Sequence, residues 1–346
     1  MGMRRIHFIY LFLAGAMLVC CAVTRGAEPA GRDVVAEIRV QAEKVRPLVE
    51  TDAVRAFLDA AKYLPTVESR AIYRDRAVNE AFTEEEFAHL AEERRAACER
   101  NVYDAEFYYY TGYGTPLLYA RALDVAAARG GIDSFAGKRV FDFGYGAIGH
   151  LRLLATLGAD AVGAEVQPVF RALYSFPGDQ GEVQAEHGGI GRVKLVHGRW
   201  PGDKTVREAV GGGFDLIVSK NVLKRGYVHP EREADPRQLI DLGVDDAAFV
   251  KALYEALSPG GLIMIYNFSP AQAQEDQAYI PWADGRCPFD RSLLKRAGFE
   301  IIAFDETDHE AAYDFWFALD LTAGASRDEL AKNLFAHYTL LRKPAG

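Results

Sequence analysis

One stretch of the chain, residues 138–168, constrains the fold more than any other. It begins with an apolar run at 140–143, passes through a glycine-rich turn, and continues with leucines at helical spacing. A second apolar run occupies 161–164 and ends at an acidic residue, Glu165. Strand, turn, helix and strand in this order predict a βαβ unit with two parallel strands.

The turn of this unit predicts a ligand as well as a shape. Its glycines are Gly144, Gly146 and Gly149, in the spacing GxGxxG. Glycines let backbone N–H groups approach a ligand, and the N-terminus of the following helix favours negative charge. Glu165 ends the second strand, where a carboxylate can accept hydrogen bonds from both hydroxyls of a ribose. A tight turn without a ligand needs only the glycines, so the whole set favours an adenosyl-bearing ligand, NAD among them.

Length, charge and cysteine spacing limit the other possibilities. The 346 residues are enough for two domains. The net charge of −9 disfavours nonspecific binding to nucleic acid. No Cys/Cys or Cys/His spacing typical of a metal site is present, so no metal is predicted. The sequence leaves open whether Cys98 and Cys287, the two cysteines beyond the N-terminal segment, form a disulfide.

Residues 1–24 have the layout of an export signal. Arg4 and Arg5 precede an uncharged, mostly apolar run at 8–23, which is short for a membrane span. We therefore expect an exported protein, periplasmic or extracellular. Two alternatives remain, namely an uncleaved membrane anchor and a cytoplasmic product whose translation starts at Met17.

We predict that the full-length product loses roughly its first 20 to 30 residues, the usual length of such signals. N-terminal sequencing of the natural protein checks this. A soluble cytosolic chain that begins at Met1 would contradict export, and one that begins at Met17 would favour the alternative start.

Residues 28–114 are predicted to form a helical cap region. Apolar residues recur at helical spacing from 34 to 58, and a capping box at 83–86 begins a further helix through Ala97. The segment 107–116 then brings several tyrosines, Tyr110 and Tyr113 among them, to the start of the next helix. They form either an aromatic lip over a ligand or a packed joint between cap and core.

The remaining residues, 115–346, are predicted to form one domain. A helix runs from 116 to 130, and five more strands follow the βαβ unit at 193–196, 214–221, 262–266, 299–304 and 335–342. The fold class is therefore α/β, with a Rossmann-like, doubly wound, mostly parallel sheet of seven strands and a helical N-terminal cap region.

Taken together, residues 115–343 resemble a class I S-adenosylmethionine-dependent methyltransferase. The motifs that carry the resemblance are Asp142 two residues before Gly144 and Gly146, Glu165 after the second strand, and the runs FDLIVSKNVL, LSPGGLIMIY and AGFEIIAF. An NAD-binding strand usually has no acid at the position of Asp142. The resemblance implies S-adenosylmethionine as the cofactor, with Asp142 near the methionine amino group, Gly144 and Gly146 beneath the cofactor, and Glu165 on the ribose.

Further site residues are expected at the carboxyl ends of the strands, where ligands lie in open α/β sheets. Trp200 either stacks on the adenine or covers the edge of the sheet, and Arg199 stands where many members of the family have an acid. The loop at 222–232 is either part of the site or a solvated connection, and its Lys224 or Arg225 would hold an anionic acceptor. The candidate cofactor-binding residues are Asp142, Gly144, Gly146, Gly149, Glu165, Trp200, Ser219, Tyr110 and Tyr113. The candidate catalytic residues are His229, Tyr227 and Asn221, with His229 the first choice of base because its ordinary pKa is nearest neutrality.

The predicted function is a methyltransferase whose acceptor, a small molecule or a protein, the sequence does not identify. Membrane contact is expected only through the N-terminal segment if it stays uncleaved. Two alternatives from other classes remain, namely an NAD(P)-dependent oxidoreductase and a non-catalytic exported protein that retains the fold.

Overall fold

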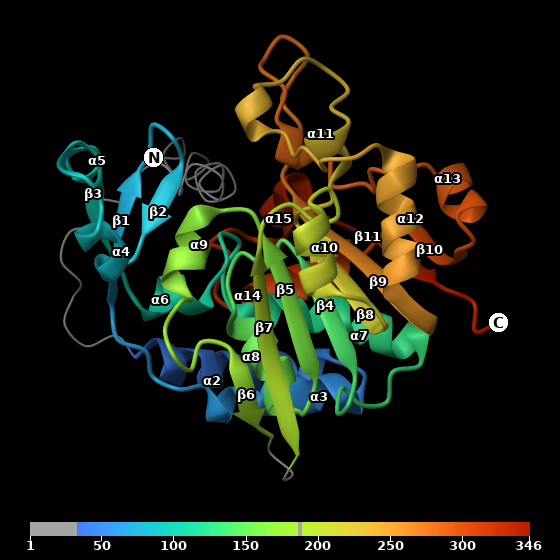
Figure 1. The fold of residues 1–346 in the computed structure, drawn as a ribbon. Helices are drawn as coiled ribbons and strands as arrows, with labels where there is room; N and C mark the ends of the chain where they lie inside the picture. Colours follow the sequence, from blue (N-terminus) through green and yellow to red (C-terminus); the bar gives the residue numbers. More distant parts are fainter. Residues whose placement is uncertain (1–32, 186–188) are drawn as a thin grey trace.

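The computed structural model describes residues 33–185 and 189–346, and the N-terminal segment predicted to direct export lies outside them. Its centre is an eight-stranded sheet in the order β10-β11-β9-β8-β4-β5-β7-β6 (Figure 1). The strands are β4 (Arg139–Phe143), β5 (Asp160–Glu165), β6 (Gly181–Gln184), β7 (Ile190–His197), β8 (Phe214–Lys220), β9 (Leu257–Ser269), β10 (Glu300–Thr307) and β11 (Phe335–Arg342).

The expected mostly parallel, doubly wound sheet is confirmed. Strands β9, β8, β4, β5 and β7 run parallel, whereas β11 is antiparallel to both its neighbours and β6 is antiparallel to β7. The expected number of seven strands is wrong by one. The additional strand, β6, lies at the edge of the sheet and is too short and too polar to show an apolar pattern.

The order of the strands creates a switch point beside β4. From β4 the chain continues to β5 and β7 on one side, and then returns to place β8 on the other side of β4. Asp142 of β4 is paired with Val218 of β8, so the carboxyl ends of these strands are neighbours. A ligand crevice is expected at that edge of the sheet.

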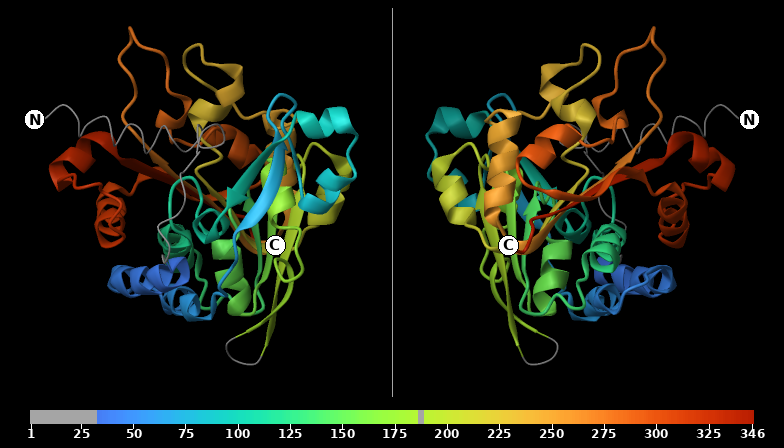
Figure 2. Two further views of the ribbon diagram at one scale, coloured as in Figure 1. Left: turned by 90° about the vertical axis from the view of Figure 1, so that its left-hand side faces the viewer. Right: turned by 90° about the vertical axis from the view of Figure 1, so that its right-hand side faces the viewer.

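Helices cover both faces of the sheet. One face packs against α7 (Tyr119–Gly130), α8 (Gly149–Thr156) and α14 (His309–Ala318), behind which lie α2 (Val34–Val45) and α3 (Asp52–Asp59). The other face packs against α10 (Lys204–Val210), α12 (Asp246–Ala256) and α13 (Arg291–Arg296). The turned views show the N-terminal helices, in blue, beside the green helices of the first layer (Figure 2). The other helices are α4 (Glu84–Ala88), α5 (Glu92–Ala96), α6 (Ala105–Tyr109), α9 (Pro168–Leu173), α11 (Arg225–Val228) and α15 (Arg327–Asn333).

The N-terminal region is helical only in its first half. From residue 70 it forms a three-stranded antiparallel sheet of β1 (Arg70–Asp75), β2 (Glu80–Phe82) and β3 (Glu99–Tyr103), so the expectation of helices to about residue 100 is wrong there. Asn79, with φ of 52°, allows the tight turn from β1 to β2. The capping box at 83–86 is confirmed, but its helix, α4, ends well before Ala97.

Buried polar contacts join this region to the large sheet. The carboxylate of Asp124 in α7, which is fully buried, accepts hydrogen bonds from the backbone N–H groups of Glu50 and Thr51 at 2.9 Å and from the Thr51 hydroxyl at 2.7 Å. On the other side, Arg70 of β1 pairs with buried Asp179 at 2.8 Å. Hydrogen bonds to buried carboxylates are strong, so these contacts hold the cap in a fixed position against the core.

Two further observations concern the cysteines and the helices. Cys98 and Cys287 are both free thiols, so they form no disulfide with each other. Among residues 33–185 and 189–346, no helix has the length and apolar character that a transmembrane span requires.

Candidate functional site

The glycine turn after β4 has the backbone that its sequence predicts. Gly144 and Gly146 have φ of 78° and 60°, a conformation that other residues adopt only under strain. A Cβ on Gly144 would lie 2.7 Å from Cγ2 of Val222, and one on Gly146 would lie 3.8 Å from the Thr111 side chain. The loop after β8 and the tyrosine-rich segment therefore both reach over this turn.

Gly149 has a packing role in the structure. It begins α8, and a Cβ there would lie 2.7 Å from the carbonyl oxygen of Tyr109. The close approach of α6 to α8 therefore requires glycine at this position, whether or not a ligand also lies near it.

Glu165 connects the end of β5 to the glycine turn. Its Oε1 accepts hydrogen bonds from the backbone N–H groups of Val166 and Gln167 at 2.8 and 3.0 Å, and its Oε2 accepts one from Gly146 at 3.2 Å. Burial raises the pKa of this carboxyl group, and the three hydrogen bonds oppose that shift. Each carboxylate oxygen has two lone pairs, so Oε2 keeps one acceptor position for a ligand.

Asp142 lies at the centre of a buried polar cluster. Its side chain is 1% exposed, and its Oδ2 accepts a hydrogen bond from the Tyr119 hydroxyl at 2.9 Å and lies 2.6 Å from Nε2 of His150. The rings of Tyr119 and His150 are stacked with centroids 3.6 Å apart. The second oxygen, Oδ1, is buried and has no hydrogen-bond partner. It is therefore a free acceptor at the carboxyl end of β4.

Lys220, the last residue of β8, faces the same cluster and was not among the residues expected to form the site. It is 5% exposed, and its Nζ lies over the rings of Phe268, Tyr119 and Tyr113, at 4.9, 5.1 and 5.8 Å from their centroids. Burial lowers its pKa to about 7, and the carboxylate of Asp142 opposes the shift. The available sequence signal was a lysine that ends a buried strand beside the switch point.

Lys224, Tyr113 and Tyr227 form a second polar group above the first. Nζ of Lys224 donates to the Tyr113 hydroxyl and the Trp282 carbonyl oxygen, both at 3.1 Å, and to the carbonyl oxygen of Phe268. Burial holds the pKa of Lys224 well below its ordinary value. Charged or neutral, the amine has all its hydrogen-bonding positions occupied by these three partners, so Lys224 has no donor left for the anionic acceptor that it was expected to hold. The hydroxyls of Tyr113 and Tyr227 lie 3.4 Å apart.

The tyrosine hydroxyls of this group suit proton donation better than proton abstraction. Burial raises the pKa of Tyr113 to about 12 and holds the pKa of Tyr227 well above its usual value. Both hydroxyls therefore stay protonated near neutral pH, which disfavours Tyr227 as a general base.

The other tyrosines of the segment are packed. Tyr108 and Tyr109 are buried, and the Tyr108 hydroxyl donates to Asp179 at 2.8 Å. Tyr110 is partly buried, and its hydroxyl lies 3.4 Å from Oε1 of Gln41 in α2. The alternative of a packed aromatic joint therefore describes these three residues, whereas Tyr113 reaches the loop after β8.

Ser219 and Asn221 shape the turn that follows β8. Oγ of Ser219 accepts a hydrogen bond from the backbone N–H of Leu223 at 3.2 Å. Asn221 has φ of 63°, and its Oδ1 accepts from the backbone N–H of Phe268 at 2.7 Å. Its Nδ2 is buried without a partner, so both N–H donors of this amide remain unused.

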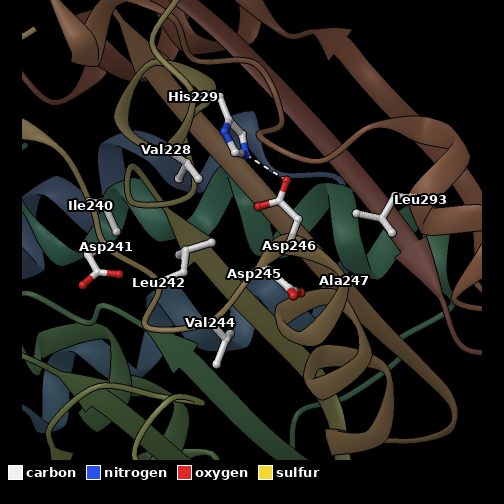
Figure 3. A pocket seen from close by; sticks show the side chains of 10 residues that line it. All are labelled: Val228, His229, Ile240, Asp241, Leu242, Val244, Asp245, Asp246, Ala247 and Leu293. Carbon is white, nitrogen blue, oxygen red and sulfur yellow. Dashed lines mark hydrogen bonds and ion pairs between the residues drawn. The ribbon is translucent and has the colours of Figure 1, made fainter.

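The structure places His229 apart from these clusters. Its Nε2 lies 2.8 Å from Oδ2 of Asp246, at the beginning of α12, beside an open surface hollow (Figure 3). The apolar lining of this hollow includes Ile240 and Leu242. Within the described part of the chain, no hydrogen bond or ring contact joins His229 to Asp142 or Lys220. The choice of His229 as a base near the cofactor gains no support from this position.

Trp200 is part of the hydrophobic core. It is 2% exposed and makes T-shaped contacts with Phe141, Phe143 and Phe249, whose ring centroids lie 5.2 to 6.0 Å away. This position corresponds to the packing alternative and leaves no free face of the ring for an adenine.

Comparisons with known proteins give weak structural similarity only. No family model and no curated protein matches the sequence. Among solved structures, the chain is similar to an S-adenosylmethionine-dependent methyltransferase from Mesorhizobium loti, with 16% identity, 64% of this chain and 97% of that chain covered, and a TM-score of 0.36. It is also similar to a magnesium protoporphyrin IX methyltransferase from Synechocystis PCC 6803 with bound S-adenosylhomocysteine, with 14% identity, 64% and 82% covered, and a TM-score of 0.33. A cyclase has 16% identity, 65% and 81% covered, and a TM-score of 0.34.

These TM-scores are all below 0.5, so the Rossmann-like fold is assigned from the strand order and the parallel core of the sheet. A fold by itself does not determine a reaction, which depends on the residues of the site.

The buried amine of Lys220 gives a testable pH dependence of stability. Its pKa of about 7 in the folded chain is below the ordinary 10.5 of an unfolded chain. Below pH 7 both states bind the proton and the full cost of burying the charge is present. Between pH 7 and 10.5 only the unfolded chain keeps the proton, so this cost falls as the pH rises.

We predict that Lys220→Met is more stable than the wild type at pH 6. The difference should shrink above pH 7 by up to about 1.4 kcal/mol per pH unit. Urea unfolding of both proteins between pH 6 and 9 measures it, with Lys251→Met, at an exposed lysine, as the control. A stability difference between Lys220→Met and the wild type that does not change with pH would contradict the lowered pKa of Lys220.

Proposed function

We propose that the protein is an S-adenosylmethionine-dependent methyltransferase whose cofactor lies at the carboxyl ends of β4, β5 and β8. The observation that carries the proposal is the free oxygen of Asp142, buried beside a glycine turn that Glu165 closes from the other side. A buried acceptor without a partner costs about 1–3 kcal/mol, which a donor on a ligand would recover.

The residues at this edge fit the parts of the cofactor. Oε2 of Glu165 has an acceptor position for a ribose hydroxyl, and Oδ1 of Asp142 has one for the ammonium of the methionine part. Gly144 and Gly146 present backbone without side chains between these two carboxylates. When bound, the cofactor supplies a methyl group on a sulfonium, and the work of the protein is to position the acceptor and exclude water.

The negative charge beside the glycine turn favours S-adenosylmethionine over the dinucleotide of a nicotinamide oxidoreductase. A dinucleotide would bring a pyrophosphate with two negative charges to the glycine turn. Asp142 and Glu165 are both buried beside that turn, and bringing further negative charge to two buried carboxylates is costly. The positively charged sulfonium and ammonium of S-adenosylmethionine fit the same carboxylates.

The acceptor is proposed to lie on the side of Tyr113 and Tyr227, above the end of β8. Their hydroxyls stay protonated and can donate hydrogen bonds to an acceptor molecule. The acceptor itself is a small molecule or a protein of unidentified class. Its identification by activity screening requires a protein that has first been shown to bind the cofactor.

Location in the cell is a separate proposal that rests on residues 1–24 alone. Export conflicts with a cofactor made in the cytosol, because a charged molecule does not cross a membrane unaided. Translation from Met17 would remove the basic residues and most of the apolar run, and would resolve this conflict.

We predict that the protein binds S-adenosylmethionine and S-adenosylhomocysteine, and that Glu165→Ala weakens this binding by about 1.5–3 kcal/mol, the range for hydrogen bonds to a charged group. Titration calorimetry measures the affinities, and thermal unfolding shows that the variant is folded. Glu182→Ala, at an exposed glutamate of β6, is the matched control and should bind as the wild type does.

Tight binding of NAD by the wild type would refute the cofactor assignment, as would unchanged affinity in folded Glu165→Ala. Binding without turnover of any acceptor would instead favour a protein that retains the fold without catalysis.

A further inference from the structure

The surroundings of Lys220 are not explained by packing alone. Its side chain is buried at the end of β8, yet no hydrogen bond or ion pair to its Nζ is found in residues 33–185 and 189–346. Three aromatic rings surround the amine instead. Buried amines normally have polar partners, because desolvating an ammonium without one is costly. Lys224, four residues later, shows the ordinary case, with three oxygen partners.

Asp142 also lacks a hydrogen-bond partner, in its case a donor. Its Oδ2 has two partners, while its Oδ1 is buried with none. The ring of Tyr119 lies between the two groups, since its hydroxyl bonds to Asp142 and Nζ of Lys220 lies over its face. His150 stacks on Tyr119 and so leaves the opposite face of that ring to the lysine.

The opposite charges of Lys220 and Asp142 are close but do not form an ion pair with each other in the described structure. They project from adjacent parallel strands at the switch point, one residue before the end of β4 and at the end of β8. A carboxylate oxygen without a donor lies beside an amine without an acceptor. This pair is complementary to an α-amino acid, which carries an ammonium and a carboxylate on one carbon.

We propose that Lys220 binds the α-carboxylate of the methionine part of the cofactor, while Asp142 binds its α-ammonium. This inference rests on the proposed function and adds to it the residue that recognises the carboxylate. Lys220 is then a binding residue of the cofactor site, and both buried groups gain their missing partners when the ligand is bound.

The protonation of Lys220 gives the proposal a pH signature. A carboxylate binds the ammonium form, and the pKa of the free lysine is lowered to about 7 by burial. The affinity for the ligand should therefore be highest below pH 7 and fall as the pH rises toward 9. A ligand without the carboxylate should lack this component of the pH dependence.

Three ligands test the contributions of the carboxylate, the ammonium and the adenosine separately. The first is S-adenosylhomocysteine, the second its decarboxylated analogue, which keeps the ammonium, and the third 5′-methylthioadenosine, which lacks the whole amino-acid part. Their dissociation constants are measured by titration calorimetry on the wild type, Lys220→Met, Lys220→Arg and the surface control Lys251→Met. Lys220→Arg keeps the positive charge at the same position. Thermal unfolding of each variant shows that it is folded.

We expect Lys220→Met to raise the dissociation constant of S-adenosylhomocysteine by about 10- to 100-fold, the range for a charge-assisted hydrogen bond. The decarboxylated analogue and 5′-methylthioadenosine should change by less than about threefold, since neither has the group that Lys220 binds. Lys220→Arg should keep part of the affinity, and Lys251→Met should bind all three ligands as the wild type does.

Equal losses for all three ligands in Lys220→Met would overturn the inference, because they would show that the lysine only shapes the pocket. Unchanged affinity for S-adenosylhomocysteine would overturn it as well and would place the lysine on the acceptor side. In both cases the wild type still binds the cofactor product, so the proposed function survives. A wild type that binds none of the ligands removes the proposed function together with the inference.

Discussion

The buried carboxylate of Asp142 is the constraint on which the site depends. A carboxylate that is 1% exposed needs hydrogen-bond donors, and the chain supplies them from two helices of one layer, Tyr119 of α7 and His150 of α8. One side chain of the sheet therefore fixes the helices that precede and follow β4. The glycine turn lies between Asp142 and α8, so its position is fixed as well.

The segments that complete the site come from distant parts of the chain. Thr111 lies over Gly146, and Val222 lies over Gly144. Tyr113 reaches Lys224, which in turn bonds to the carbonyl oxygen of Phe268 at the end of β9. The switch point makes this meeting possible, because it leaves the carboxyl ends of β4 and β8 open to segments from either side. The tyrosine segment and the loop after β8 thus form one wall with shared hydrogen bonds.

Much of the fold was predictable because its signals are local. The last strand was expected at 335–342 and has these bounds. Helix α4 begins after Thr83, as expected, because the Thr83 hydroxyl and the Glu86 carboxylate form a capping box there. The small sheet at 70–103 was missed because its strands are short and largely polar, so their stability comes from contacts such as the stacking of Tyr73 on Phe87.

The site was predictable in its backbone and less so in its side chains. The glycines and the two carboxylates follow from spacing along the chain. Burial decides the roles of the others, and burial depends on tertiary packing. Trp200 is covered by Phe249 of α12, and His229 is turned toward Asp246. Lys220 shows the reverse case, since a charge at the end of a strand usually reaches solvent and here it is enclosed by aromatic rings.

The central claim is that Asp142 and Lys220 are unpaired because a ligand completes them. A crystal structure of the protein grown with S-adenosylhomocysteine tests this most directly. The account predicts the adenosine at the carboxyl ends of β4 and β5 with Glu165 on the ribose, and the amino-acid end between Asp142 and Lys220. Ligand density elsewhere, for example in the hollow beside His229, would contradict it, as would an empty site in crystals grown at saturating ligand concentration.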